Sequence, residues 1–212
     1  MLKNAFLYIL FFLFSPGLLA ADLLVDDPGL QECVNTLAKK HQWHTAESFV
    51  SIVCHNKGIE TLAGLENFIN VKKLSFHKNN ITHASFSSFP NLEHLNIARN
   101  KLETLELSKL PNLKELYFFG NNIHKVHLGD LENLARLKAS SSEIEVFSYN
   151  NLPKLEKIYL FDNKMETIDI YKLPAMKYMD VRQNPMPDEL YEDMDRVKGV
   201  TILHDGNAED WQ

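Results

Sequence analysis

A phrase of 21 residues recurs along the chain, and this period constrains the fold more than any other feature of the sequence. The phrase is L-x-x-L-x-L-x-x-N-x-L-x-x-L-x-L-x-x-L-P-x, and its copies begin at Val71, Leu92, Leu113, Leu134, Leu155 and Met176. A period in the twenties is typical of a solenoid, because one copy cannot bury its apolar stripe alone and stacks on its neighbours. We therefore predict one elongated repeat domain, and we number the positions of the phrase as slots 1 to 21.

Slot 9 carries an amide side chain in almost every copy. Its residues are Asn79, Asn100, Asn121, Asn163 and Asn184, with Ser142 as the exception. The carbonyl oxygen and the NH2 group of an Asn amide can together satisfy backbone groups where each strand ends, so stacked copies should form a ladder of hydrogen bonds. Ser142 can make only half of these bonds. In this register the apolar slots 1, 4, 6, 11, 14, 16 and 19 point inward.

With these residues in place, the chain resembles the leucine-rich repeat proteins over residues 49–187. An earlier coil fits the phrase with one added residue, through Phe49, Ile52, Cys54, Ile59, Leu62, Leu65 and Phe68. Its stretch I-E-T-L-A-G-L-E resembles the 22-residue coils of internalin-like proteins, and Lys57 in its ladder slot suits a terminal coil. The resemblance implies a horseshoe with a parallel β-sheet on its concave face, and a function in binding.

Residues 1–20 have the pattern of a secretory signal peptide. Lys3 precedes an apolar run over residues 5–14, Pro16 ends the run, and small residues follow. The run is short for a bilayer span, although an uncleaved anchor is the alternative. We predict an exported protein, periplasmic or secreted, without stable membrane insertion after cleavage.

The charge balance narrows the possible partners. Loss of Lys3 with the signal leaves 21 cations and 28 carboxylates, a net charge of −7. This mild acidic excess argues against nucleic acid, because proteins that bind it carry a basic stripe. It also argues against adhesion driven by anionic lipid.

We predict an N-terminal helical cap over residues 21–48, since an open solenoid exposes apolar edges. Asp27 can cap a helix that has Pro28 at its first position. Cys33 on this helix and Cys54 in the first coil are the two cysteines, and export would favour a disulfide between them. Two buried free thiols are the alternative. A helical cap, a tryptophan, a cysteine and a short coil in this order also resemble exported leucine-rich repeat proteins of Gram-negative bacteria.

A C-terminal cap and acidic tail is predicted for residues 188–212. One-face apolar spacing predicts a helix over 188–197, followed by a strand over 200–203. Residues 204–212 are polar and acidic, and we expect them to fray, with no role for Trp211 evident from the pattern.

Slots 3, 5 and 7 alternate with the inward slots along each strand, so their side chains should face the concave side. Aromatic residues gather there in the C-terminal half, around a lysine and beside a rim of cations. The predicted partner-binding residues are Tyr117, Phe119, Lys138, Tyr159, Phe161, Tyr178, Arg136, Lys157 and Arg182. Aromatic anchors near cations are typical of a binding hot spot, and Ser140 beside Lys138 should leave a shallow groove between aromatic walls. The alternative is that Tyr and Phe are simply good strand residues.

Two further patterns concern the rest of the coils. His55, His77 and His94 could converge to hold zinc, but no cysteine or carboxylate completes the set, so we predict no metal site. On the convex side, E-T-L-E-L-S-K-L-P and E-T-I-D-I-Y-K-L-P alternate at period two, which predicts extended backbone or short strands.

The function predicted is recognition of a protein partner by a non-enzymatic module without a cofactor. The sequence lacks G-x-S-x-G, H-E-x-x-H and the phosphate-binding P-loop phrase. Stacked tyrosines and phenylalanines also suit sugar faces, so a glycan or peptidoglycan binder is the alternative. A hydrolase with a site that the sequence does not reveal is a third possibility.

Overall fold

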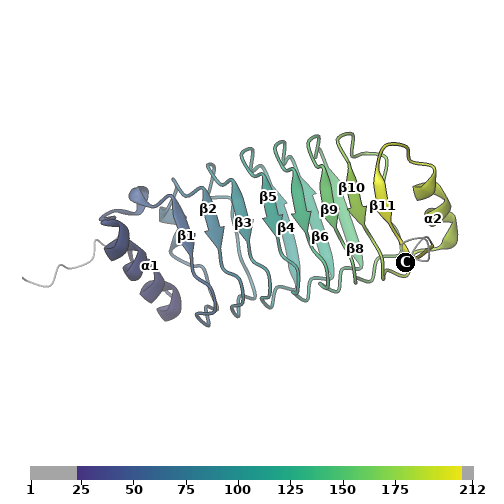
Figure 1. Cartoon of the computed structure of the whole chain (residues 1–212). Helices are drawn as coiled ribbons and strands as arrows, with labels where there is room; N and C mark the ends of the chain where they lie inside the picture. Colours follow the sequence, from purple (N-terminus) through teal and green to yellow (C-terminus); the bar gives the residue numbers. More distant parts are fainter. Residues whose placement is uncertain (1–22, 207–212) are drawn as a thin grey trace, which may run out of the picture.

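The coils stack into a solenoid whose front is an eight-stranded parallel sheet (Figure 1). The computed structural model describes residues 23–206, and the predicted signal peptide and Trp211 lie outside this part. The strands of the front sheet, in spatial order, are β1 (Ser51–Val53), β2 (Lys73–Ser75), β3 (His94–Asn96), β5 (Glu115–Tyr117), β7 (Arg136–Lys138), β9 (Lys157–Tyr159), β10 (Tyr178–Asp180) and β11 (Thr201–Leu203). Equivalent slots pair across the strands, as in the row Leu95, Leu116 and Leu137. The predicted solenoid with a parallel sheet is confirmed.

A second, three-stranded parallel sheet lies behind the front sheet in the central coils. Its strands are β4 (Thr104–Ser108), β6 (Lys125–Gly129) and β8 (Val146–Asn150). The predicted extended segment around Thr104 is confirmed as a strand. The segment at 166–171 is not a strand, and there the Tyr149 hydroxyl donates to the backbone carbonyl of Asp169.

The inward slots form one continuous core along the solenoid. From Phe49 to Met186 their side chains are buried, except that Ala84 and Tyr149 are half-buried. Leu74, Leu95, Leu116, Leu137 and Ile158 occupy the same slot in successive coils, so each contacts its equivalents on both sides. The core therefore depends on every coil keeping the same register.

The slot-9 asparagines form the predicted ladder. The Asn100 Nδ2 donates to the carbonyls of Ile97 in its own coil and Phe76 in the preceding coil, at 2.9 Å each. Its Oδ1 accepts from the N–H of Ile81, at 3.1 Å. The equivalent bonds recur at Asn79, Asn121, Asn163 and Asn184. Each buried amide therefore ties two coils together through backbone groups.

The backbone changes where slot 9 is not Asn. Gly58, which follows Lys57, and Glu143, which follows Ser142, have positive φ values of 71° and 62°. In the second case the Asn163 Oδ1 accepts from two N–H groups, those of Ser142 and Ile144, at 3.1 Å each. The following coil therefore supplies the acceptor that these positions lack.

A second row of asparagines lies nearer the surface, in slot 21. Asn91, Asn112 and Asn133 each donate from Nδ2 to the slot-20 carbonyl of the preceding coil, at 3.3, 2.9 and 2.6 Å. Water can replace these bonds more easily than those of slot 9, because the groups are partly exposed.

The N-terminal cap begins with α1 (Pro28–His41), whose N-cap is Asp27 as predicted. The Asp27 Oδ1 accepts from the N–H of Leu30 at 3.0 Å, and Oδ2 accepts from the N–H of Glu60 at 2.8 Å. One carboxylate therefore caps the helix and ties it to the first coil. Burial alone would raise the pKa of Asp27, but these backbone hydrogen bonds hold that pKa below its ordinary value.

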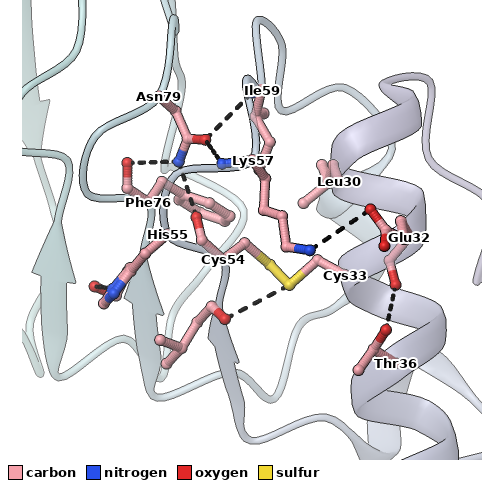
Figure 2. The surroundings of a disulfide bond; sticks show 12 residues. Leu30, Glu32, Cys33, Thr36, Cys54, His55, Lys57, Ile59, Phe76 and Asn79 are labelled. Atoms are coloured by element: carbon pink, nitrogen blue, oxygen red, sulfur yellow. Dashed lines mark hydrogen bonds and ion pairs between the residues drawn. A yellow bond between two sulfur atoms is a disulfide. The ribbon is translucent and has the colours of Figure 1, made fainter.

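One disulfide and two aromatic contacts complete this cap. Cys33 and Cys54 are joined by a disulfide with an S–S distance of 2.06 Å, which links the helix to the first coil (Figure 2). The Trp43 ring lies 4.7 Å from that of Phe49, measured between centroids, and His41 stacks on Trp43 at 4.4 Å. Short 3-10 turns lie at Ala46–Ser48, between α1 and β1, and at Leu65–Asn67, between β1 and β2.

The C-terminal cap consists of α2 (Asp188–Asp195) and β11. The helix buries Tyr191 and Met194, and it ends two residues before the predicted boundary. The prediction that 204–212 frays is wrong at its start, since His204 is fully buried and stacks on the Tyr191 ring at 4.8 Å. Within residues 23–206, no helix is long and apolar enough to span a bilayer.

We expect the disulfide to stabilise the cap against unfolding. A Cys33→Ser/Cys54→Ser variant should lose about 3 kcal/mol of unfolding free energy, because the crosslink restricts the unfolded chain. Denaturant melts of the two proteins give this difference. Non-reducing mass spectrometry should find the crosslinked peptide pair in exported protein, and two alkylatable thiols there would contradict the pairing.

We expect the buried ladder to matter more than the outer one. Asn121→Ala should lower the unfolding free energy by about 1 to 3 kcal/mol, because it leaves buried backbone groups without partners. Asn112→Ala, in the exposed row, is the matched control and should cost less than about 1 kcal/mol. Equal losses in denaturant melts would show that slot 9 has no special role.

Candidate binding surface

The slots predicted to face solvent form three columns on the front sheet, which we call the front face. The strands place Tyr117 and Tyr159 in slot 5, Phe119 and Phe161 in slot 7, and Tyr178 in slot 3. We call these five residues the aromatic patch. All five are half-buried rather than freely exposed.

Lys138 lies between the two slot-5 tyrosines. Its Nζ is 5.4 Å from the centroid of the Tyr117 ring and 5.3 Å from that of Tyr159. Both distances are within the range of cation–π attraction. The predicted groove is therefore occupied at this level by the lysine, and the small side chain on this strand is that of Ser140, in slot 7.

A second cation, Arg182, lies at the C-terminal edge of the aromatic patch. The Arg182 guanidinium lies 5.7 Å from the centroid of the Phe161 ring, and its Nη2 is 2.7 Å from Oδ2 of the buried Asp180. Tyr159 and Tyr178 are adjacent, with centroids 5.2 Å apart. Burial, and then the charge of Asp180, raises the pKa of the Tyr178 hydroxyl.

Glu115 links several groups beside the patch. Its carboxylate oxygens lie 3.2 Å from His94 Nδ1 and 3.2 Å from Arg136 Nη1. Burial alone would raise the pKa of Glu115, but hydrogen bonds from Tyr117 and His94 and the charge of Arg136 hold it below its ordinary value. Burial raises the pKa of the Tyr117 hydroxyl, so this hydroxyl keeps its proton at neutral pH.

A shallow depression adjoins the patch on its N-terminal side. Its volume is about 230 Å³. Its lining includes the side chains of His55, Lys73, Ser75, His94, Asn96, Glu115 and Tyr117. The small size of the depression suits a side chain of a larger ligand better than a whole small molecule.

The three histidines considered as possible zinc ligands are each engaged with other neighbours. The rings of His55 and His77 are 5.8 Å apart, but His55 Nε2 hydrogen bonds with Ser75 Oγ at 2.7 Å and His94 pairs with Glu115. Burial, and then the charges of His55 and Arg99, lowers the pKa of His77. Across residues 23–206, no group of three or more His, Cys, Asp or Glu side chains is placed to hold a metal ion.

Comparison with known proteins shows which repeat and which fold this chain resembles. Residues 69–123 match the family model described as leucine rich repeat. Residues 69–123 thus match the repeat, and the fold of the chain is a leucine-rich repeat solenoid. No curated protein sequence matches it.

Solved leucine-rich repeat structures have the same arrangement of coils. An internalin (InlF) of Listeria monocytogenes is 22% identical with a TM-score of 0.55, over 84% of this chain and 63% of the internalin. Internalin C2 of the same species is 18% identical with a TM-score of 0.52, over 86% of this chain and 95% of its own. The chain thus spans less than two thirds of the first internalin. Such a fold is typical of protein–protein interaction modules, and no catalytic family is indicated.

The register of the leucine-rich repeat determines which residues of the binding surface could be predicted from the sequence. Alternation along the strands places the aromatic residues and Lys138, but by itself it does not show that Glu115 and Asp180 pair with Arg136 and Arg182. The signal was available in part, because Glu115 and Arg136 occupy the same slot in adjacent coils and therefore pair directly.

Proposed function

We propose that this leucine-rich repeat protein is an exported, non-enzymatic module that binds a protein partner through the aromatic patch on its front face. In this proposal residues 1–20 are a cleaved signal, 21–48 and 188–212 are the caps and tail, and 49–187 present the binding surface. The destination is the periplasm or the exterior of the cell.

The observation that carries the proposal is the half-buried state of the aromatic rings together with the cations over them. Lys138 and Arg182 restrict the rings of Tyr117, Tyr159 and Phe161, so little side-chain freedom remains to be lost on binding. Aromatic and arginine side chains on a firm base dominate the energy of many protein interfaces. Arg136 and Lys157 extend this surface at its rim.

Two observations support export. The apolar run after Lys3 has the length and flanks of a signal peptide. The Cys33–Cys54 disulfide is the kind of bond that persists in oxidising compartments. Together they are consistent with a protein that leaves the cytoplasm.

The proposal predicts opposite effects at two adjacent residues. Phe161→Ala should weaken binding to a captured partner about 30-fold, or about 2 kcal/mol, if the ring is an anchor. Its unfolding free energy should fall by less than about 1 kcal/mol, because the ring is partly exposed. Leu160→Ala should instead lose about 2 to 5 kcal/mol of stability, since Leu160 is fully buried.

The measurement uses the wild-type protein to capture partners from the native compartment, followed by titration calorimetry and denaturant melts of each variant. Unchanged binding of Phe161→Ala to the identified partner would reduce the patch to strand-forming surface. A signal on a glycan array that is lost on Tyr159→Ala would favour a sugar ligand over a protein.

A further inference from the structure

Charge is distributed unevenly between the front face and the rest of the molecule. Among the residues in slots 3, 5 and 7, five are cations and two are carboxylates, a net charge of +3. The remaining 17 cations and 26 carboxylates give −9 elsewhere. The front face is thus positively charged although the protein as a whole is acidic. This charge favours the approach of negatively charged partners.

The two carboxylates of the front face already have partners. Glu115 pairs with His94 and Arg136, and Asp180 pairs with Arg182. Lys73 and Lys138, in contrast, make no ion pair in the described part of the protein, and Lys157 lies near Glu156, which itself pairs with Lys177. The charge that the front face leaves unbalanced is therefore positive.

Lys138 is the most constrained of these lysines. It is half-buried in the middle of the aromatic patch, and tyrosine rings on both sides lie within 5.4 Å of its Nζ. The rings displace some water from the ammonium, and cation–π contact replaces only part of that hydration. Lys157, on the neighbouring strand β9, adds a second cation close by. A carboxylate arriving here would meet positive charge and apolar ring surface at the same place.

We infer that the partner presents an acidic protein segment, in which Asp or Glu side chains alternate with apolar or aromatic ones. This inference rests on the proposed function and names its partner class. The carboxylate binds at Lys138 and Lys157, and the apolar side chain packs against Phe119, Phe161 or Tyr178. A polyphosphate would use the cations but not the rings, so the aromatic patch disfavours it, and a sulfated sugar is tested separately with heparin.

Random copolymers of defined composition test the inference without a known partner. The purified protein is immobilised and titrated with a glutamate–tyrosine copolymer, a lysine–tyrosine copolymer of equal tyrosine content, and heparin. We expect binding of the glutamate–tyrosine copolymer, at least about tenfold weaker binding of the lysine–tyrosine copolymer, and a roughly tenfold loss of affinity between ~50 and ~500 mM NaCl.

Charge-reversal variants locate the binding. Lys138→Glu and Lys157→Glu should each weaken binding of the glutamate–tyrosine copolymer about fivefold or more. Lys125→Glu, on the exposed side of β6, makes the same charge change away from the front face and should leave binding within about twofold. Thermal melts of all three variants establish that they are folded.

Several results would overturn the inference. One is equal binding of the two copolymers, and another is unchanged binding by both Lys138→Glu and Lys157→Glu. A third is heparin binding that depends on Lys138 while no ligand responds to Phe161→Ala. A captured partner that responds to Phe161→Ala but not to salt or Lys138→Glu would reject the acidic segment and leave the proposed function standing. Insensitivity to all of these changes would reject both.

Discussion

The amide hydrogen bonds of slot 9 are the interaction on which the rest of the structure depends. Each asparagine binds carbonyls in its own coil and the preceding one, and it accepts an N–H from the preceding coil. A coil displaced by one residue would lose these bonds and turn its apolar slots outward. The residue before each ladder position, from Asn56 to Gln183, has a φ between 50° and 68°, and Gly120 is the only glycine among them. This repeated left-handed turn ends every front strand at the same place.

The binding surface follows from that register. Because slots 4 and 6 must face the core, slots 3, 5 and 7 must lie on the opposite side of the sheet, and a sheet spacing of about 4.8 Å brings their side chains into contact across coils. Lys138 reaches both tyrosines because β5 and β9 flank its own strand. The caps serve the same end, since the disulfide and Asp27 keep the first coil closed at one end and α2 covers the other.

Much of this architecture could be predicted from the sequence because it depends on repetition. The period, the ladder residues, the Asp27 cap and the strand near 200–203 each follow from local patterns. What could not be predicted depends on how individual side chains settle between coils. The Tyr149 hydroxyl donates to the carbonyl of Asp169, and His204 is buried and stacks on the Tyr191 ring. The position of Lys138 over two rings is likewise a choice among rotamers that the pattern does not encode.

The most direct test of the central claim, that the ladder register decides which side chains face solvent, uses two adjacent residues in one coil. Ala139→Cys and Ser140→Cys are both conservative changes, and the native cysteines are held in a disulfide. Ala139 is fully buried and Ser140 is half-buried in slot 7. Under native conditions a maleimide should label Ser140→Cys at least ~100-fold faster than Ala139→Cys, which reacts only on opening of the coil. Equal rates, or faster labelling of Ala139→Cys, would contradict the register and with it the front face.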